Sequence, residues 1–194
     1  MHEASDESLM VDFVAGDEKA FEVLVRKYEA PLVNFLFRYL GDSADAEEVF
    51  QEAFIRVYTK RERFDADRKF KTWLYTIALN LARTALKRKR SAPLVAREEE
   101  SGGSQDKIVL EGEAAEEYSP ERSQETKELG EMVRAAVTSL PQKQREVFML
   151  FQYQGLNYAE IASILGRPVG TIKSQMHYAV AALREKLKEA DLHS

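Results

Sequence analysis

The segment "FKTWLYTIALNLARTALKRKR", from Phe70 to Arg90, combines helically spaced apolar residues with a basic end and contains no acidic residue. The apolar residues expected to form its buried stripe, with Trp73 and Ala78 alongside, are Phe70, Leu74, Ile77 and Leu81. Apolar residues three and four positions apart lie on one face of an α-helix. The segment therefore predicts an amphipathic helix that contributes to a core.

A line of polar residues steps by three and four positions along the other side of this helix. Its members are Thr72, Thr76, Asn80, Arg83 and Lys87. Hydroxyl, amide and cationic groups are the ones that contact phosphates and base edges. A solvated helix surface gives the same pattern, so the segment alone leaves an ordinary surface and a nucleic-acid surface open.

Composition excludes several classes of protein. The chain has 194 residues, 44% of them hydrophobic, and no cysteine, which excludes disulfides, thiolate metal sites and cysteine nucleophiles. Its three histidines do not cluster with acidic residues, so we expect no metal, no cofactor and no enzymatic activity. The chain also lacks an apolar run of about 20 residues and the charge order of a signal peptide. We therefore expect a cytoplasmic protein without membrane insertion.

Charge and composition change in the middle of the chain. Residues 91–128 carry 4 basic and 11 acidic side chains, whereas residues 1–90 carry 16 of each. The middle segment is rich in Glu and interrupted by Gly and Pro, which is typical of a chain that cannot bury enough apolar surface to fold. We expect a flexible acidic linker between two small helical domains, so the predicted fold class is all-α.

The N-terminal part contains two further predicted helices. One presents an apolar face made by Phe21, Leu24, Val25, Tyr28, Leu32, Phe35, Leu36 and Tyr39. Pro31 is expected to bend or interrupt this helix, and Gly41 to end it. The next helix is expected to start with Ser43 as N-cap. Its predicted apolar face contains Ala46, Val49, Phe50, Ala53 and Val57.

The C-terminal part contains a helix-turn-helix pattern. Two amphipathic helices come first, one ending near Leu140 and one running from Pro141 to Gly155. Ala162, Gly166 and Ile172 then follow at the spacing of a small residue, a tight turn and an apolar plug from the second helix. The N-terminal half of that second helix would enter a major groove.

Three segments, in this order, resemble the bacterial RNA polymerase sigma factors of the extracytoplasmic-function type. They are "DAEEVFQEAFIRVY", "FKTWLYTIALNLAR" and the stretch from Leu140 to Leu187. The resemblance implies a protein that binds core RNA polymerase and promoter DNA, directs promoter-specific initiation, and is controlled by an anti-sigma factor. It implies a region 2 domain at 1–92, a linker at 93–122 and a region 4 domain at 123–194.

The resemblance also implies roles for three sets of residues. The clamp helices of the largest polymerase subunit would contact Asp45, Glu48, Gln51 and Glu52. The downstream (−10) promoter element would contact Arg63, Phe64, Lys69, Thr72, Trp73, Thr76, Asn80, Arg83 and Lys87, with Phe64 and Asn80 near a flipped base. The upstream (−35) element would contact Arg167, Thr171, Lys173, Ser174, Gln175, His177 and Tyr178. The flap of the second polymerase subunit is a further implied partner.

Two positions depart from the family's usual pattern. Gln175 and Tyr178 stand where members often carry arginine. Loss of two cations should weaken phosphate attraction and change which bases are read. An alternative interpretation of the C-terminal pattern is a stand-alone helix-turn-helix regulator that binds its operator without polymerase, but that class does not account for the segments at 45–58 and 70–83.

Overall fold

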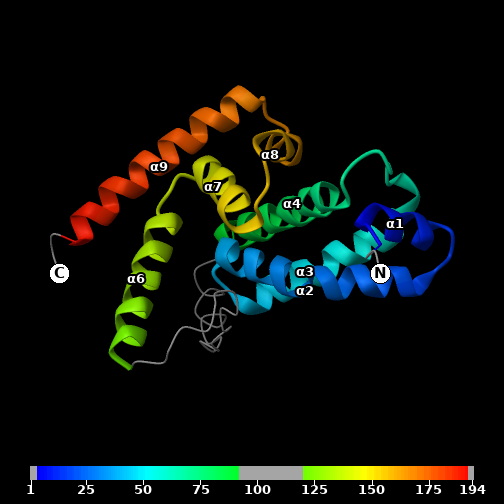
Figure 1. Ribbon diagram of the computed structural model, residues 1–194, viewed down its shortest axis with the longest axis horizontal. Helices are drawn as coiled ribbons and strands as arrows, with labels where there is room; N and C mark the ends of the chain where they lie inside the picture. The colour runs from blue at the N-terminus through cyan, green and yellow to red at the C-terminus, as the bar shows by residue number, and fades with distance from the viewer. Residues whose placement is uncertain (1–3, 92–119, 192–194) are drawn as a thin grey trace. The chain divides into compact units, whose positions relative to one another are not determined.

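The computed structural model describes residues 4–91 and 120–191, and these ranges are almost entirely helical, which confirms the predicted all-α class. Contacts divide the chain into two compact units (Figure 1). The helices of the first unit are α1 (Asp6–Val14), α2 (Glu18–Leu40), α3 (Ser43–Thr59), the 3₁₀ turn η1 (Arg61–Arg63) and α4 (Phe70–Ser91). The helices after residue 119 are α6 (Pro120–Thr138), α7 (Gln142–Gln154), α8 (Tyr158–Leu165) and α9 (Val169–Asp191). Most of the predicted linker lies outside the described residues. Helix α6 begins at Pro120, before the predicted end of the linker at residue 122.

Helix α2 is the central helix of the first unit and packs against α1, α3 and α4. The Asp17 carboxylate caps its N-terminus, and Gly41, at φ 81°, ends it as predicted. The expected interruption at Pro31 does not occur, because the helix continues through this residue. Pro31 lies on the exposed side, so water can reach the Lys27 carbonyl whose hydrogen bond the proline removes.

Helix α3 begins one residue earlier than expected, at Ser43. The side chain of Asp42, and not of Ser43, accepts the capping hydrogen bond, from the Asp45 N–H at 2.9 Å. The buried face contains Phe54 in place of Phe50, which is half-buried. Carboxylates and hydroxyls are both good N-caps, so adjacent Asp and Ser left the start ambiguous by one residue.

The buried stripe of α4 is rotated relative to the prediction. Phe70, Leu74 and Ala78 are buried as expected, but Ile77 and Leu81 are half-buried. The remaining buried positions are Tyr75, Leu79, Ala82 and Ala85. Because α4 packs against both α2 and α3, its buried face is wider than one stripe and centres on the side that faces the two neighbours.

The part of the chain after residue 119 contains the predicted helix-turn-helix. Helix α9 packs against α6 and α7, and Ile172 is completely buried. Gly166 has φ 63°, the left-handed conformation that a tight turn between α8 and α9 requires, and Gly155 ends α7 in the same way. The first half of α9 buries Ile172 and Met176 on one side and exposes Thr171, Lys173 and Ser174 on the other.

Candidate protein and nucleic-acid interfaces

A groove of about 500 Å³ runs between α3 and α4. Its lining from α3 includes Glu48, Gln51 and Glu52, three of the four residues predicted to contact the polymerase clamp. Its lining from α4 includes Leu81, Thr84 and Arg88. The groove therefore joins acidic, amide and apolar groups on one open surface of the first unit.

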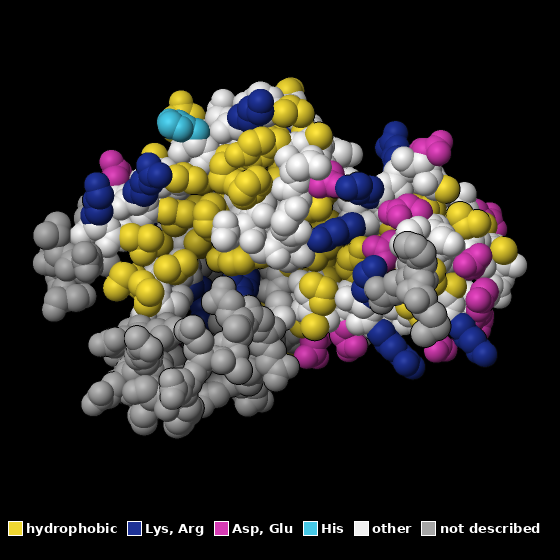
Figure 2. Space-filling view, in the orientation of Figure 1, with side chains coloured by type: hydrophobic (Ala, Val, Ile, Leu, Met, Phe, Trp, Pro, Cys, Tyr) yellow, Lys and Arg dark blue, Asp and Glu magenta, His cyan; other side chains and the backbone are white. Residues whose placement is uncertain are grey.

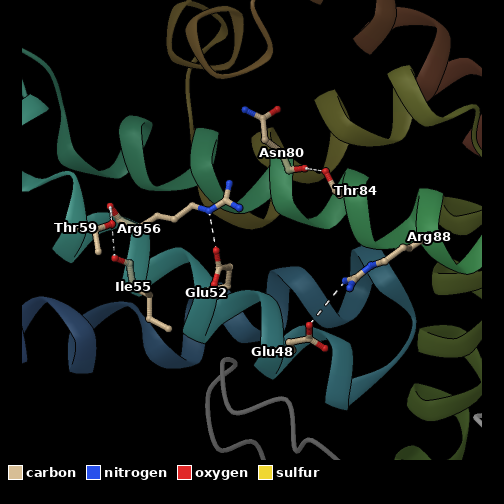
Figure 3. A network of polar contacts seen from close by, with 8 residues as sticks. All are labelled: Glu48, Glu52, Ile55, Arg56, Thr59, Asn80, Thr84 and Arg88. Carbon is tan, nitrogen blue, oxygen red and sulfur yellow. Dashed lines mark hydrogen bonds and ion pairs between the residues drawn. The ribbon is translucent and has the colours of Figure 1, made fainter.

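The acidic side chains of this groove are paired with cations of the same unit. Glu52 accepts a hydrogen bond from Arg56 Nε at 2.9 Å, and Glu48 lies 3.8 Å from an Arg88 nitrogen (Figure 3). The Glu48 side chain is 71% exposed and that of Glu52 43%. Exposed ion pairs contribute only about 0–1 kcal/mol to stability, so an incoming partner can replace them at little cost.

The fourth predicted clamp residue, Asp45, differs from the other three. Its side chain is only 19% exposed and lies 2.6 Å from Lys89 Nζ on α4. Asp45 therefore ties the start of α3 to the end of α4. The structure brings Glu48, Gln51 and Glu52 together on one open groove, whereas Asp45 does not line it.

An aromatic cluster supports the loop before α4. The rings of Phe64 and Trp73 have centroids 5.4 Å apart, and Phe64 lies 6.0 Å from Phe70, which in turn contacts Tyr28 at 5.4 Å. Phe64 and Trp73 are half-buried, so each keeps an accessible part beside a packed one. Arg63 lies exposed in the same loop. An aromatic ring partly open to solvent beside a cation can stack on an unpaired base.

Helix α1 contacts the first turn of α4, and the sequence pattern did not predict this contact. The Glu7 carboxylate accepts a hydrogen bond from the Phe70 backbone N–H at 3.0 Å. This N–H is one of the four at a helix start that lack an intrahelical acceptor. Nearby, the Tyr28 hydroxyl donates to Asp6 at 2.5 Å, and burial, helped by this carboxylate, raises the pKa of Tyr28 far above its usual value. No local signal could have predicted the Glu7 contact, because 63 residues separate its partners.

The predicted polar line of α4 lies on the side opposite its buried stripe. Asn80 and Lys87 are exposed, whereas Thr72, Thr76 and Arg83 are half-buried. An Arg83 guanidinium nitrogen donates to Asn80 Oδ1 at 3.3 Å, and the Thr76 hydroxyl donates to the Thr72 carbonyl at 2.7 Å. Figure 3 shows Asn80 on the other side of α4 from Glu48 and Glu52. The polar line and the acidic groove are therefore separate surfaces of the same unit.

The outward side of α9 presents most of the residues predicted to read the upstream element. The exposed ones are Thr171, Lys173, Ser174, His177 and Tyr178. Figure 2 shows Lys, Arg and His side chains along this outer side of α9. Gln175 and Arg167 are half-buried and contact each other at 3.1 Å. Helix α9, which follows the turn, thus carries cationic, hydroxyl, amide and aromatic groups.

The described residues hold no group of three or more His, Asp or Glu side chains that could bind a metal ion. Among these helices, none is long and apolar enough to span a membrane.

Comparisons with known proteins agree with this arrangement. Residues 24–92 match the Sigma-70 region 2 family and residues 130–183 match Sigma-70 region 4. The chain is 35% identical to the ECF RNA polymerase sigma factor SigW of Bacillus subtilis over 174 residues, which are 90% of this chain and 92% of SigW. It is 36% identical to the ECF RNA polymerase sigma-E factor of Escherichia coli K12 over 191 residues, 95% of each chain.

Two solved structures share the fold. CnrH, solved in complex with the cytosolic domain of CnrY, aligns with a TM-score of 0.69 and 23% identity over 96% of this chain and 99% of CnrH. The sigma factor RpoE of Bartonella quintana, solved with the anti-sigma factor NepR, aligns with a TM-score of 0.61 and 24% identity over 89% of this chain and 97% of RpoE. From the sequence relatives and the two matched regions, the chain belongs to the extracytoplasmic-function (ECF) RNA polymerase sigma factors, which direct promoter-specific transcription initiation.

Proposed function

We propose that this sigma factor binds the clamp helices of core RNA polymerase through the groove between α3 and α4. The observation that carries the proposal is that Glu48, Gln51 and Glu52 line one open groove although they come from a helix that also supplies core residues. The carboxylates are held by exposed ion pairs, which a basic surface of the polymerase can exchange for its own cations. Asp45 would support this surface by tying the start of α3 to α4 through Lys89.

The opposite side of α4 would read and open the downstream promoter element. A base extruded from the duplex needs a pocket that supplies stacking and hydrogen bonds, because unpairing costs a few kcal/mol. The half-buried rings of Phe64 and Trp73 offer stacking, and the exposed Asn80 amide offers hydrogen bonds. Further contacts to phosphate and base edges would come from the rest of this surface: Arg63, Lys69, Thr72, Thr76, Arg83 and Lys87.

The first half of α9 would read the upstream element in a major groove. A helix-turn-helix places the N-terminal residues of its second helix against base edges. The exposed hydroxyl, cationic and imidazole groups of Thr171, Lys173 and His177 suit such contacts. This assignment completes the proposed division into a region 2 domain at 1–92 and a region 4 domain at 123–194, with the flap of the second polymerase subunit as a further partner.

Charge reversal in the groove tests the polymerase-binding proposal. The double variant Glu48→Lys and Glu52→Lys should keep its helical content and melting temperature, because both ion pairs are exposed. Its affinity for core polymerase should fall at least tenfold (about 1.4 kcal/mol), since attraction becomes like-charge repulsion. Affinity is measured by fluorescence titration of labelled sigma factor with core polymerase.

The matched control reverses the same charge on another helix of the unit. Glu22 pairs with Arg26 four residues later, as Glu52 pairs with Arg56, and Glu29 is exposed on the same helix. Glu22→Lys with Glu29→Lys should therefore bind core polymerase like the parent. Equal affinities of both double variants would reject the groove as the clamp site. Operator binding by the parent without polymerase would favour the stand-alone regulator.

We further infer control by an anti-sigma factor, supported by membership of the ECF family. A protein that copurifies with the chain from its own host and blocks transcription by the reconstituted holoenzyme would be this factor. A copurifying protein without effect on transcription would not.

A further inference from the structure

Glu146 is buried to 0% exposure, although charged side chains are rarely buried without a partner. It comes from the first half of α7, in the core of the second unit. One carboxylate oxygen accepts a hydrogen bond from the Arg167 guanidinium at 2.8 Å, and the other accepts one from the Gln142 amide at 3.1 Å. The buried charge is therefore neutralised by an arginine that lies in the turn between α8 and α9.

Arg167 connects this buried carboxylate to α9. Its second terminal nitrogen donates to Gln175 Oε1 at 3.1 Å and to the Lys143 carbonyl at 3.4 Å. The Arg167 side chain is only 19% exposed. A guanidinium is a planar fork of donors, so one group can hold a carboxylate on one side and an amide oxygen on the other.

This contact fixes which end of the Gln175 amide faces the core. A guanidinium has donors only, so the Gln175 oxygen must face Arg167. The Nε2 amino group is the other branch of the same amide and is left to donate to another acceptor. Gln175 lies on α9 between Ser174 and Met176, one step from the exposed residues that the proposed function sets against the upstream element.

The fixed orientation changes what Gln175 can read. An unrestrained glutamine recognises adenine with both halves of its amide, because adenine offers a donor and an acceptor side by side in the major groove. With its oxygen engaged by Arg167, Gln175 is presented as a donor. Guanine, whose O6 and N7 are both acceptors, suits a donor best.

We propose that Arg167, held by the buried Glu146, is a positioning residue that presents Gln175 as a hydrogen-bond donor and thereby sets a guanine preference at one position of the upstream element. The proposal rests on the proposed function of α9. It gives Arg167 a role different from the direct DNA contact that the family resemblance implies, since its guanidinium is engaged on both sides within the protein.

The experiment measures transcription by reconstituted holoenzyme from a promoter library that is randomised across the upstream element and carries a fixed downstream element. Sequencing of the transcripts compares four proteins: the parent, Gln175→Ala, the double variant Glu146→Leu with Arg167→Met, and the triple variant that combines all three substitutions. The double variant removes both members of the pair, because apolar replacement of a whole buried ion pair preserves folding whereas removal of one partner strands a charge. Lys173→Ala is the matched control, since loss of a phosphate contact weakens all sequences alike.

The parent should prefer guanine at one upstream position roughly fivefold to tenfold, the value of one or two base-edge hydrogen bonds. Gln175→Ala should remove this preference, and the double variant should reduce it to within about twofold with Gln175 still present. The triple variant should match Gln175→Ala at that position. If the double variant fails to fold, Arg167→Lys replaces it, because an ammonium can neutralise Glu146 but lacks the fork that also holds Gln175.

Three results would overturn the inference alone: an unchanged preference in the folded double variant or in Arg167→Lys, an unchanged profile in Gln175→Ala, or a parent preference for adenine at that position. A parent holoenzyme that initiates from no library member would instead overturn the proposed function.

Discussion

Loss of the contact between Glu7 and the start of α4 should destabilise the first unit measurably. The carboxylate accepts the Phe70 N–H at 3.0 Å in a partly buried setting. A hydrogen bond to a charged group contributes about 1.5–3 kcal/mol to stability. The attraction between a negative charge and a helix N-terminus is counted within this range and is not added to it. Glu7→Ala should therefore lower the stability of the first unit by about 1.5–3 kcal/mol. Glu7→Gln keeps an acceptor without the charge and should lose about half of that.

The single tryptophan of the chain gives a local readout of this change. Trp73 lies in the first turn of α4, against Phe64, so its fluorescence reports unfolding of the first unit and not of the second. For a unit of this size, 1 kcal/mol corresponds to roughly 4–8 °C in melting temperature, so Glu7→Ala should shift the Trp73 transition by on the order of 10 °C. The matched control is Glu29→Ala, at an exposed position of α2, which should change stability by less than about 0.5 kcal/mol. Equal transitions for Glu7→Ala and Glu29→Ala would refute the capping role.

Three further outcomes are expected. Leu74→Ala should lower stability by about 2–5 kcal/mol because Leu74 is fully buried, whereas Asn80→Ala should change it by less than about 0.5 kcal/mol. Asn80→Ala should instead reduce the permanganate reactivity of downstream-element thymines, and pre-melted templates should rescue this defect. Burial raises the pKa of Tyr28 and Tyr75 far above their usual value, so the stability they contribute is complete below pH 10 and is lost as pH rises further; a spectroscopic alkaline titration should show both phenols ionising only with unfolding. Lys173→Ala should reduce the slope of log affinity against log salt by about one for the upstream element, and an unchanged slope would exclude a phosphate contact.

Local signals predicted α2, α3, α4 and the helices of the C-terminal part, although they did not identify α1. The turn glycines Gly41 and Gly155 ended α2 and α7 as expected, because a left-handed residue after a helix is specified by the glycine itself. The position of Ile172 in the core also followed from local spacing. These features depend on residues within one or two turns of each other, which is the range that a sequence pattern records.

Features that depend on distant neighbours were missed. The buried face of α4 includes Leu79 and excludes much of Ile77, since two flanking helices decide which side is covered. The Glu7 contact spans 63 residues and the contact between Glu146 and Arg167 spans 21. Single-residue chemistry shows a carboxylate and a donor in each case, but only the fold shows that they meet.

Ion pairs connect the proposed polymerase-binding residues to the basic end of α4. Glu48 and Asp45, proposed for the polymerase side, pair with Arg88 and Lys89 at the basic end of α4. When polymerase takes over these acids, the two cations become more available to phosphates, so binding of polymerase should favour binding of DNA.

The magnitude of this coupling is limited by exposure. The Glu48 and Arg88 side chains are 71% and 73% exposed, so their pair contributes about 0–1 kcal/mol, which corresponds to at most about fivefold in affinity. The less exposed Asp45 and Lys89 pair also fastens α3 to α4, and its release would cost part of what it gains. Charge release alone therefore cannot make promoter binding depend on polymerase. Under the proposed function, most of that dependence would come from polymerase holding both α4 and α9 on one promoter, which converts two weak contacts into one bivalent contact.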